Sequence, residues 1–155
     1  MNIKEGQKAP EFTLPDQNND IHNLADYKGK WVLLYFYPKD NTPGCTKQAC
    51  DIRDNFELFK KAGITVLGMS KDSVKSHKKF EEKHDLPFTL LSDEELTTLQ
   101  AYDVWHKKKM MGREYMGIMR TSFLINPEGN IAKIYEKVKP PAHAEMILQD
   151  IKELT

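Results

Sequence analysis

The sequence predicts an α/β domain in which a central mixed β-sheet is flanked by helices. Three observations indicate this class. Residues 31–37 (WVLLYFY) are continuously apolar and aromatic, as expected of a central strand covered on both faces. Segments of helical periodicity then alternate with short apolar runs. Near the C-terminus, two apolar runs flank Asn126-Pro-Glu-Gly-Asn130, a strong hairpin turn signal.

The order of the expected elements predicts a thioredoxin-like fold with an N-terminal β-hairpin extension. Residues 1–155 form one domain of this kind, because a chain of this length buries enough surface without further staples. The turn-rich first 30 residues contain a short hairpin around Phe12 and Leu14. The elements that follow are strand 31–37, ended by Pro38; helix 43–62, with Gly63 after its end; strand 64–69; helix 73–84; strand 88–91; helix 94–102; an irregular, basic segment 103–117; strands 120–125 and 131–138; and helix 143–154.

The composition argues against several classes of protein. Lys plus Arg equals Asp plus Glu at 23 each, so no net charge attracts the chain to nucleic acid or to an anionic membrane. The first residues lack an apolar signal sequence, and no apolar run approaches the roughly 20 residues that span a bilayer. Two cysteines cannot form the scaffold of a disulfide-rich secreted domain. We therefore expect a cytoplasmic protein with reduced thiols.

The two cysteines lie five residues apart at the predicted start of a helix. Thr42 is a good N-cap residue and Pro43 suits the first helical position, so Cys45 falls at the third, N3. There its sulfur lies beside unpaired backbone N–H groups and the positive end of the helix dipole, which favour thiolate over thiol. A buried structural cysteine is the alternative. The capped position after a strand favours a reactive thiol.

The spacing of Cys45 and Cys50 restricts their chemistry. Five residues of helix separate two Cα atoms by roughly 8.5–9 Å, whereas a disulfide tolerates about 7 Å at most. A disulfide between these thiols therefore requires the first turns of the helix to unwind.

Two other uses of paired cysteines agree less well with the sequence. A structural zinc site needs four ligands with short Cys-x2-4-Cys spacing, and the histidines form no such motif. A thioredoxin-type exchange enzyme has Cys-x-x-Cys, with both sulfurs at the helix start. We expect no metal and no cofactor. The histidines are His22, His77, His84, His106 and His143.

Several stretches resemble the peroxiredoxin family. Pro38-x-x-x-Thr42-x-x-Cys45 is similar to the family's active-site signature, and TPGCTKQAC, ending at Cys50, is similar to its bacterioferritin-comigratory (PrxQ) subfamily. RTSFLIN, which begins at Arg120, is similar to the segment that brings a second active-site arginine or its equivalent to the sulfur. The resemblance extends from the N-terminal GxxAPxF to the last helix.

The resemblance implies a thiol peroxidase that reduces hydrogen peroxide and organic hydroperoxides. Cys45 would attack the O–O bond to give a sulfenic acid, and Cys50 would resolve it as an intramolecular disulfide. Thioredoxin or a similar dithiol would then reduce the disulfide. Many members of the subfamily are monomers, so we expect a monomer here.

A thiolate alone does not explain such a rate. Full ionisation of an ordinary thiol at pH 7 raises the reactive fraction only about 30-fold, whereas enzymes commonly exceed about 10⁶-fold. The remainder must come from groups that stabilise the breaking O–O bond. The candidate donors are the Gly44 and Cys45 N–H groups, the Thr42 hydroxyl and the Arg120 guanidinium; Pro38 would shield the sulfur from water.

Some of these residues have simpler explanations. Thr42 can be present simply because it caps the helix, and Pro38 because it ends the strand. Both of these structural roles are compatible with the catalytic ones. Most arginines are solvated surface residues, and Arg53 and Arg113 are also present. Arg53 lies eight residues beyond Cys45, too far for contact, and is expected to form a structural ion pair.

Two other functions remain open from the residues alone. A general thiol–disulfide exchanger would act without peroxide, and a redox-sensing or chaperone-like binding module would use the disulfide only as a switch. The segment WHKKKMM, residues 105–111, is basic and apolar, and we expect a solvated loop near the active-site rim there. The methionines in and after it offer an adaptable apolar surface for a hydrophobic peroxide or a reductase.

Overall fold

Five strands form the central sheet, in the spatial order β5-β4-β3-β8-β9. The computed structural model describes residues 2–137 and 139–155. Strand β3 occupies the middle of the sheet, parallel to β4 and antiparallel to β8, so the sheet is mixed as predicted. The strands are β3 (Trp31–Phe36), β4 (Ile64–Ser70), β5 (Thr89–Ser92), β8 (Thr121–Ile125) and β9 (Ile131–Glu136).

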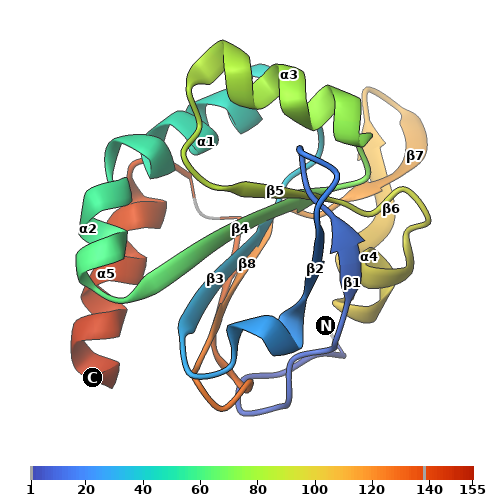
Figure 1. Ribbon diagram of the computed structural model, residues 1–155. Coiled ribbons are helices and arrows are strands. Elements are labelled where there is room, and N and C mark those ends of the chain that lie inside the picture. Colours follow the sequence, from blue (N-terminus) through green and yellow to red (C-terminus); the bar gives the residue numbers. More distant parts are fainter. Residues whose placement is uncertain (1, 138) are drawn as a thin grey trace.

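The side chains of β3 alternate between two hydrophobic clusters, one on each face of the sheet. Leu33 and Tyr35 pack against the buried residues of the four longer helices. Leu34 and Phe36 face the N-terminal segment, a 3-10 helix and the shortest α-helix. Figure 1 shows these two layers on opposite sides of the sheet. The helices are η1 (Leu24–Tyr27), α1 (Pro43–Asp54), α2 (Phe56–Lys61), α3 (Val74–His84), α4 (Thr97–Ala101) and α5 (Ala142–Leu154).

The predicted N-terminal hairpin is confirmed. Strands β1 (Thr13–Pro15) and β2 (Ile21–Asn23) pair antiparallel, and Phe12 beside them is buried in the second cluster. None of the helices in the described ranges has the length and apolarity that crossing a bilayer requires.

The helix predicted over residues 43–62 is wrong in one respect, because it is two helices. Asn55 leaves helical geometry, with φ −103° and ψ 8°, between α1 and α2. Its side-chain amide donates a hydrogen bond to the Asp51 carbonyl at 2.8 Å, an alternative to the regular backbone pattern that asparagine commonly offers. Gly63 follows α2 with φ +76°, the left-handed conformation expected after a helix end. Helix α1 is therefore an independent segment of 12 residues.

The prediction of an irregular segment over residues 103–117 is wrong. Strands β6 (Trp105–Met110) and β7 (Arg113–Ile118) form an antiparallel hairpin there. Its two turn residues, Met111 and Gly112, have φ values of +51° and +78°, as in the tight turns that suit strand twist. The strands show no apolar alternation because both faces of the hairpin are largely exposed.

The remaining elements differ from prediction mainly in their ends. The helix expected over residues 94–102 is only α4, because Leu96 is in the left-handed region (φ +67°) and the Asp93 carboxylate caps the Leu99 N–H at 2.8 Å. Strand β9 ends at Glu136, and the predicted last residue of this strand, Val138, lies outside the described residues.

Candidate active site

Helix α1 begins as predicted. Thr42 is the N-cap with extended backbone angles (φ −90°, ψ 152°), Pro43 is the first helical residue, and Cys45 is the third. The first regular helical hydrogen bond runs from the Thr46 N–H to the Thr42 carbonyl at 2.8 Å. The N–H groups of Gly44 and Cys45 precede this bond, so helical geometry gives them no partner within α1. The Cys45 sulfur therefore lies at the positive end of the helix.

The Thr42 hydroxyl does not have the hydrogen-bonding role expected of it. It makes no capping hydrogen bond and donates instead to the Lys39 carbonyl at 2.7 Å. Since its one hydrogen is engaged there, the hydroxyl is available to a bound molecule as an acceptor, for example of a hydroperoxide O–H. In this conformation Thr42 is not a free donor, and its role in catalysis stays a prediction.

Arg120 reaches the sulfur from a distant part of the chain, at the start of the strand that pairs with β3. It lies directly before β8, and its Nη2 donates to Cys45 Sγ at 3.4 Å. Cys45 itself is only 2% exposed, so this contact is shielded from bulk water. Arg53 takes no part: it donates to Asp54 and to the His84 carbonyl. Arg113 lies exposed in the β6–β7 hairpin.

Gln48 holds the Arg120 guanidinium beside the sulfur, and the sequence analysis did not identify it. Its Oε1 accepts a hydrogen bond from Arg120 Nη1 at 2.6 Å, and the residue is 1% exposed. A position three residues after Cys45 lies on the same face of a helix, and this spacing is the signal that could have found it. Gln48 fixes one arm of the guanidinium while the other contacts the sulfur.

Cys50 lies on the same helix and is half-buried; both thiols are free. The helical positions of Cys45 and Cys50 separate their Cα atoms by roughly 8.5–9 Å, beyond the range of a disulfide. In this conformation the two sulfurs cannot bond. Pro38 is half-buried directly after Tyr37, beyond the end of β3, and its shielding of the sulfur stays a prediction.

A second cation lies near the sulfur. Burial, and next the charge of Arg120, lowers the pKa of Lys108, while the neighbouring Cys45 acts in the opposite direction. The Lys108 stem lies over Gly117, where an added Cβ would come within 3.1 Å of Cδ. Among the three consecutive lysines of β6 it is the only one that is half-buried.

Two buried aromatic side chains lie behind the site. Burial, and next the charge of Cys45, raises the pKa of Tyr35 well above its ordinary value. Burial, and next the charge of Arg120, lowers the pKa of His143 to about 4. His143 Nε2 lies 2.7 Å from the Ser122 hydroxyl, whereas its Nδ1 and the Tyr35 hydroxyl have no hydrogen-bond partner among the described residues. Both groups are therefore neutral near pH 7.

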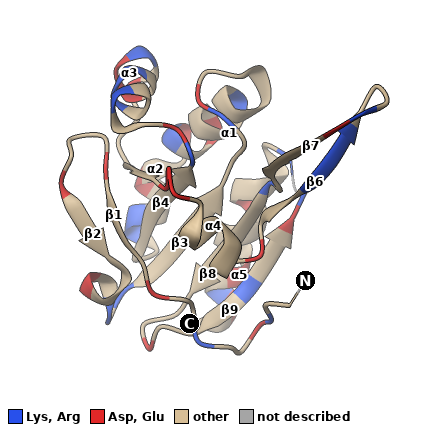
Figure 2. Ribbon diagram, turned by 90° about the vertical axis from the view of Figure 1, so that its right-hand side faces the viewer, with Lys and Arg blue, Asp and Glu red and all other residues tan. Residues whose placement is uncertain are grey.

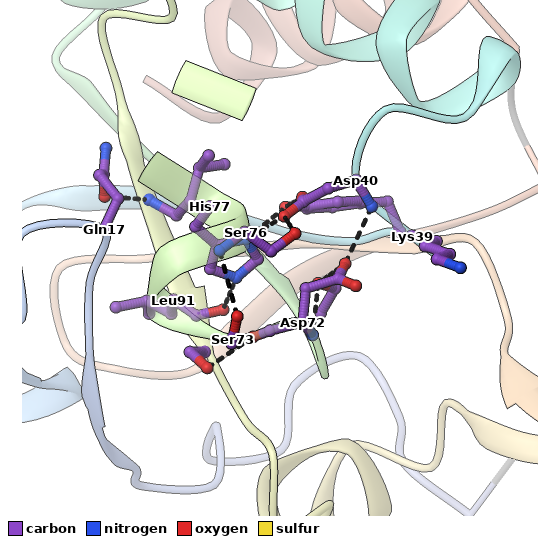
Figure 3. Close-up of polar contacts among 12 residues, drawn as sticks. Gln17, Lys39, Asp40, Asp72, Ser73, Ser76, His77 and Leu91 are labelled. Atoms are coloured by element: carbon purple, nitrogen blue, oxygen red, sulfur yellow. Dashed lines mark hydrogen bonds and ion pairs between the residues drawn. The ribbon is translucent and has the colours of Figure 1, made fainter. Parts of the chain in front are cut away.

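The loop that leads to α1 is fastened by a buried polar network centred on Asp40 (Figure 3). The Asp40 carboxylate, 2% exposed, accepts hydrogen bonds from the Tyr37 hydroxyl at 2.6 Å and the Ser76 hydroxyl at 2.8 Å, and His77 Nδ1 lies 2.7 Å away. The Asp40 N–H donates to Asp72 at 2.9 Å. These bonds attach the loop before Thr42 to α3 and to the end of β4.

His77 joins this network to strand β5. Its Nε2 lies 2.9 Å from the Leu91 carbonyl, which can only accept, so Nε2 carries a hydrogen. Its other nitrogen, Nδ1, faces the Asp40 carboxylate. Oxygen and nitrogen atoms of Asp40, Asp72 and His77 lie within 4.8 Å of one another, as metal ligands do. They are already engaged in hydrogen bonds within the protein, which supports a structural role.

Comparisons with known proteins find relatives that match this chain over most or all of its length. The model of the AhpC/TSA family matches residues 5–134. The chain is 49% identical to Peroxiredoxin Bcp of Bacillus subtilis over 155 residues, which is 100% of this chain and 99% of the relative. It is 47% identical to Peroxiredoxin Bcp of Escherichia coli over 151 residues, or 97% of each chain.

Solved structures show the same similarity. A mutant of PrxQ from Xylella fastidiosa superposes with a TM-score of 0.92 at 36% identity, over 99% of this chain and 98% of that one. The bacterioferritin comigratory protein of Xanthomonas campestris, studied for its alkyl peroxide reduction activity, gives a TM-score of 0.89 at 36% identity, over 97% and 98% of the two chains.

Proposed function

The chain belongs to the AhpC/TSA family and is a peroxiredoxin of the Bcp (PrxQ) type, a thiol peroxidase; from this premise we propose that Cys45 is the peroxidatic thiol and Cys50 the resolving thiol. The observation that carries the assignment is the Arg120 Nη2 to Cys45 Sγ contact of 3.4 Å at the start of α1. The substrates are hydrogen peroxide and organic hydroperoxides.

In the first step, the Cys45 thiolate attacks one peroxide oxygen and the O–O bond breaks. The products are a sulfenic acid on Cys45 and an alkoxide or hydroxide, which takes up a proton to leave as alcohol or water. Arg120 and the N–H groups of Gly44 and Cys45 surround the atoms on which negative charge develops, and Gln48 holds Arg120 in place. Donors fixed in this way stabilise the transition state without reorganising.

In the second step, Cys50 attacks the sulfenic sulfur, a disulfide forms, and water leaves. The first turns of α1 must unwind for this, because the intact helix holds the sulfurs apart. Two features support such an opening: the break at Asn55 separates α1 from α2, and Gly44 weakens the first turn by roughly 0.5–1 kcal/mol relative to alanine.

The cycle is closed by a dithiol reductant, thioredoxin or a protein like it, which takes the disulfide back to two thiols. Two free thiols are the resting state of such an enzyme in a reducing compartment, so we place it in the cytoplasm, acting as a monomer.

The test is a pair of substitutions followed by stopped-flow measurement of peroxide consumption. Cys45→Ser should abolish the reaction. Cys50→Ser should consume one equivalent at the rate of the parent and then stop, with Cys45 trapped as a sulfenic acid or a mixed disulfide. Unchanged steady-state turnover of Cys50→Ser with thioredoxin would remove Cys50 from the mechanism.

An insulin-reduction assay and the same stopped-flow measurement separate the two other functions. A thiol–disulfide exchanger would reduce insulin without peroxide, and a redox-sensing module would lose its Cys45 thiol no faster than free cysteine does. Rapid loss of this thiol on addition of one equivalent of peroxide supports the peroxidase.

A further inference from the structure

The β6–β7 hairpin projects from the body of the protein and ends in an apolar tip. Figure 2 shows it extending away from the sheet and the helices. At the tip, Met110 is 61% exposed and Met111 is 96% exposed. Tyr115 and Met116, on β7, are also exposed. Exposed apolar side chains gathered at one projecting point indicate a site of interaction rather than ordinary surface.

The hairpin is also strongly basic. Its 14 residues, 105–118, contain four Lys or Arg and one Glu, a net charge of +3. Because the whole chain has a net charge of zero, the rest of the molecule carries −3. The sequence predicts no attraction to an anionic membrane because the net charge of the chain is zero. That zero is the sum of a positive hairpin and a negative remainder, so the charges are separated in space. The basic residues are Lys107, Lys108, Lys109 and Arg113.

The arrangement of these charges identifies the kind of partner. Successive residues of a strand point to opposite faces, so Lys107 and Lys109 lie on one face of the hairpin and Lys108 on the other, with Arg113. Lys109 on one face and Arg113 on the other therefore place positive charge on both sides of the apolar tip. A lipid surface that receives the tip meets charges on both faces at once.

We propose that the β6–β7 hairpin docks on an anionic phospholipid surface, with Met110 and Met111 inserted among the headgroups and with Lys109 and Arg113, beside them, contacting lipid phosphates. Lys109 and Arg113, next to the tip, make no ion pair in the part of the chain that the structure describes, whereas Lys107 is 3.4 Å from Glu114. Methionine suits such a tip because its flexible, polarisable side chain adapts to irregular surroundings.

Docking in this way determines where the active site lies relative to the membrane. The base of the hairpin is anchored by the buried Ile118, two residues before Arg120. The active site therefore lies at the base of the hairpin, and the lipid surface would meet the opposite end. The inference itself does not rest on the peroxidase activity.

The experiment is co-sedimentation of the reduced full-length protein with vesicles. Binding is expected to vesicles made of equal parts phosphatidylglycerol and phosphatidylcholine, to weaken with added salt, and to be absent with phosphatidylcholine alone. Each basic residue near such a surface changes the partition about fivefold, so Lys109→Gln combined with Arg113→Gln should weaken it about 25-fold. Met110→Ser combined with Met111→Ser should weaken it at least about tenfold.

Matched controls exclude a general effect of charge or apolar surface. Lys79→Gln combined with Lys83→Gln removes two exposed charges from α3, and Met146→Ser removes an exposed methionine from α5; both should bind as the parent does. Thermal unfolding of each variant verifies its fold. Absence of binding to anionic vesicles, equal binding to neutral ones, or hairpin variants that bind as the parent does would overturn the proposal. A concentration-dependent dimer lost in the hairpin variants, without vesicle binding, would assign the hairpin to self-association instead.

Discussion

Replacing Arg120 with methionine should nearly abolish the reaction of Cys45 with peroxide while leaving the fold intact. The substitution keeps most of the apolar stem and removes the guanidinium, whose Nη2 lies 3.4 Å from the sulfur. Removing one fixed donor from a developing oxyanion typically lowers the rate about 100- to 1,000-fold. We expect a loss of this size in the second-order rate constant.

The same substitution has a second, independent consequence for stability. Gln48, 1% exposed, would lose the donor that now lies 2.6 Å from its Oε1. A buried acceptor left unpaired costs about 1–3 kcal/mol of unfolding free energy. Gln48→Leu should therefore slow the reaction less than Arg120→Met does, because the guanidinium remains but is held by one contact instead of two.

The assay is stopped-flow loss of the Cys45 thiol under hydrogen peroxide, in a Cys50→Ser background so that only the first step is observed. Arg53→Met is the matched control. Arg53 lies in α1, the helix that contains Cys45, but it donates to Asp54 and to the His84 carbonyl and not to the sulfur. It should react at the rate of the parent. An Arg120→Met protein that is folded and reacts within threefold of the parent would refute the assignment of Arg120 to the site.

Three further predictions follow from the helix, the buried histidine and the polar network. Lys47→Gly, at an exposed position of α1, should speed disulfide formation about fivefold relative to Lys47→Ala by making unwinding easier; stopped-flow fluorescence measures this, and Lys60→Gly in α2 should have no effect. Burial lowers the pKa of His143 to about 4 in the folded protein. As the pH falls, the imidazole of the unfolded chain is therefore protonated at a higher pH than that of the folded protein, which favours unfolding. Stability should then fall by about 3 kcal/mol from this residue between about pH 6.5 and pH 4; urea unfolding should show a smaller fall for His143→Gln. Asp40→Asn should cost about 3 kcal/mol or more in the same assay because it leaves buried donors unmatched, whereas Asp54→Asn, in a surface pair, should cost less than about 1 kcal/mol; equal costs would contradict the network.

Local signals in the sequence were sufficient for the start of α1. Pro43 specifies a helix start through its fixed φ, and Thr42 occupies the N-cap position although its hydroxyl makes no capping hydrogen bond, so the position of Cys45 follows from local sequence. The same holds for β3, because a run of apolar residues long enough for one strand has to be buried on both faces. The family resemblance added Arg120, whose contact with Cys45 joins residues 75 positions apart.

The features that sequence reasoning missed depend on distant partners or on weak patterns. Asp40 and His77 are 37 residues apart, and nothing in either segment indicates that their side chains lie in contact. The β6–β7 hairpin lacks apolar alternation because it projects into solvent, so only its Met111-Gly112 turn could have indicated it. The break at Asn55 depends on one side-chain amide that competes with the backbone, which periodicity does not detect.

Hydrogen exchange of the α1 amides, compared between the reduced and the peroxide-oxidised protein, tests most directly whether Cys45 and Cys50 react through an unwound helix. The mechanism predicts that oxidation abolishes protection over residues 45–50 while α2, beyond Asn55, keeps its protection. Full protection of α1 in a protein whose two cysteines are shown by mass spectrometry to be bridged would contradict it.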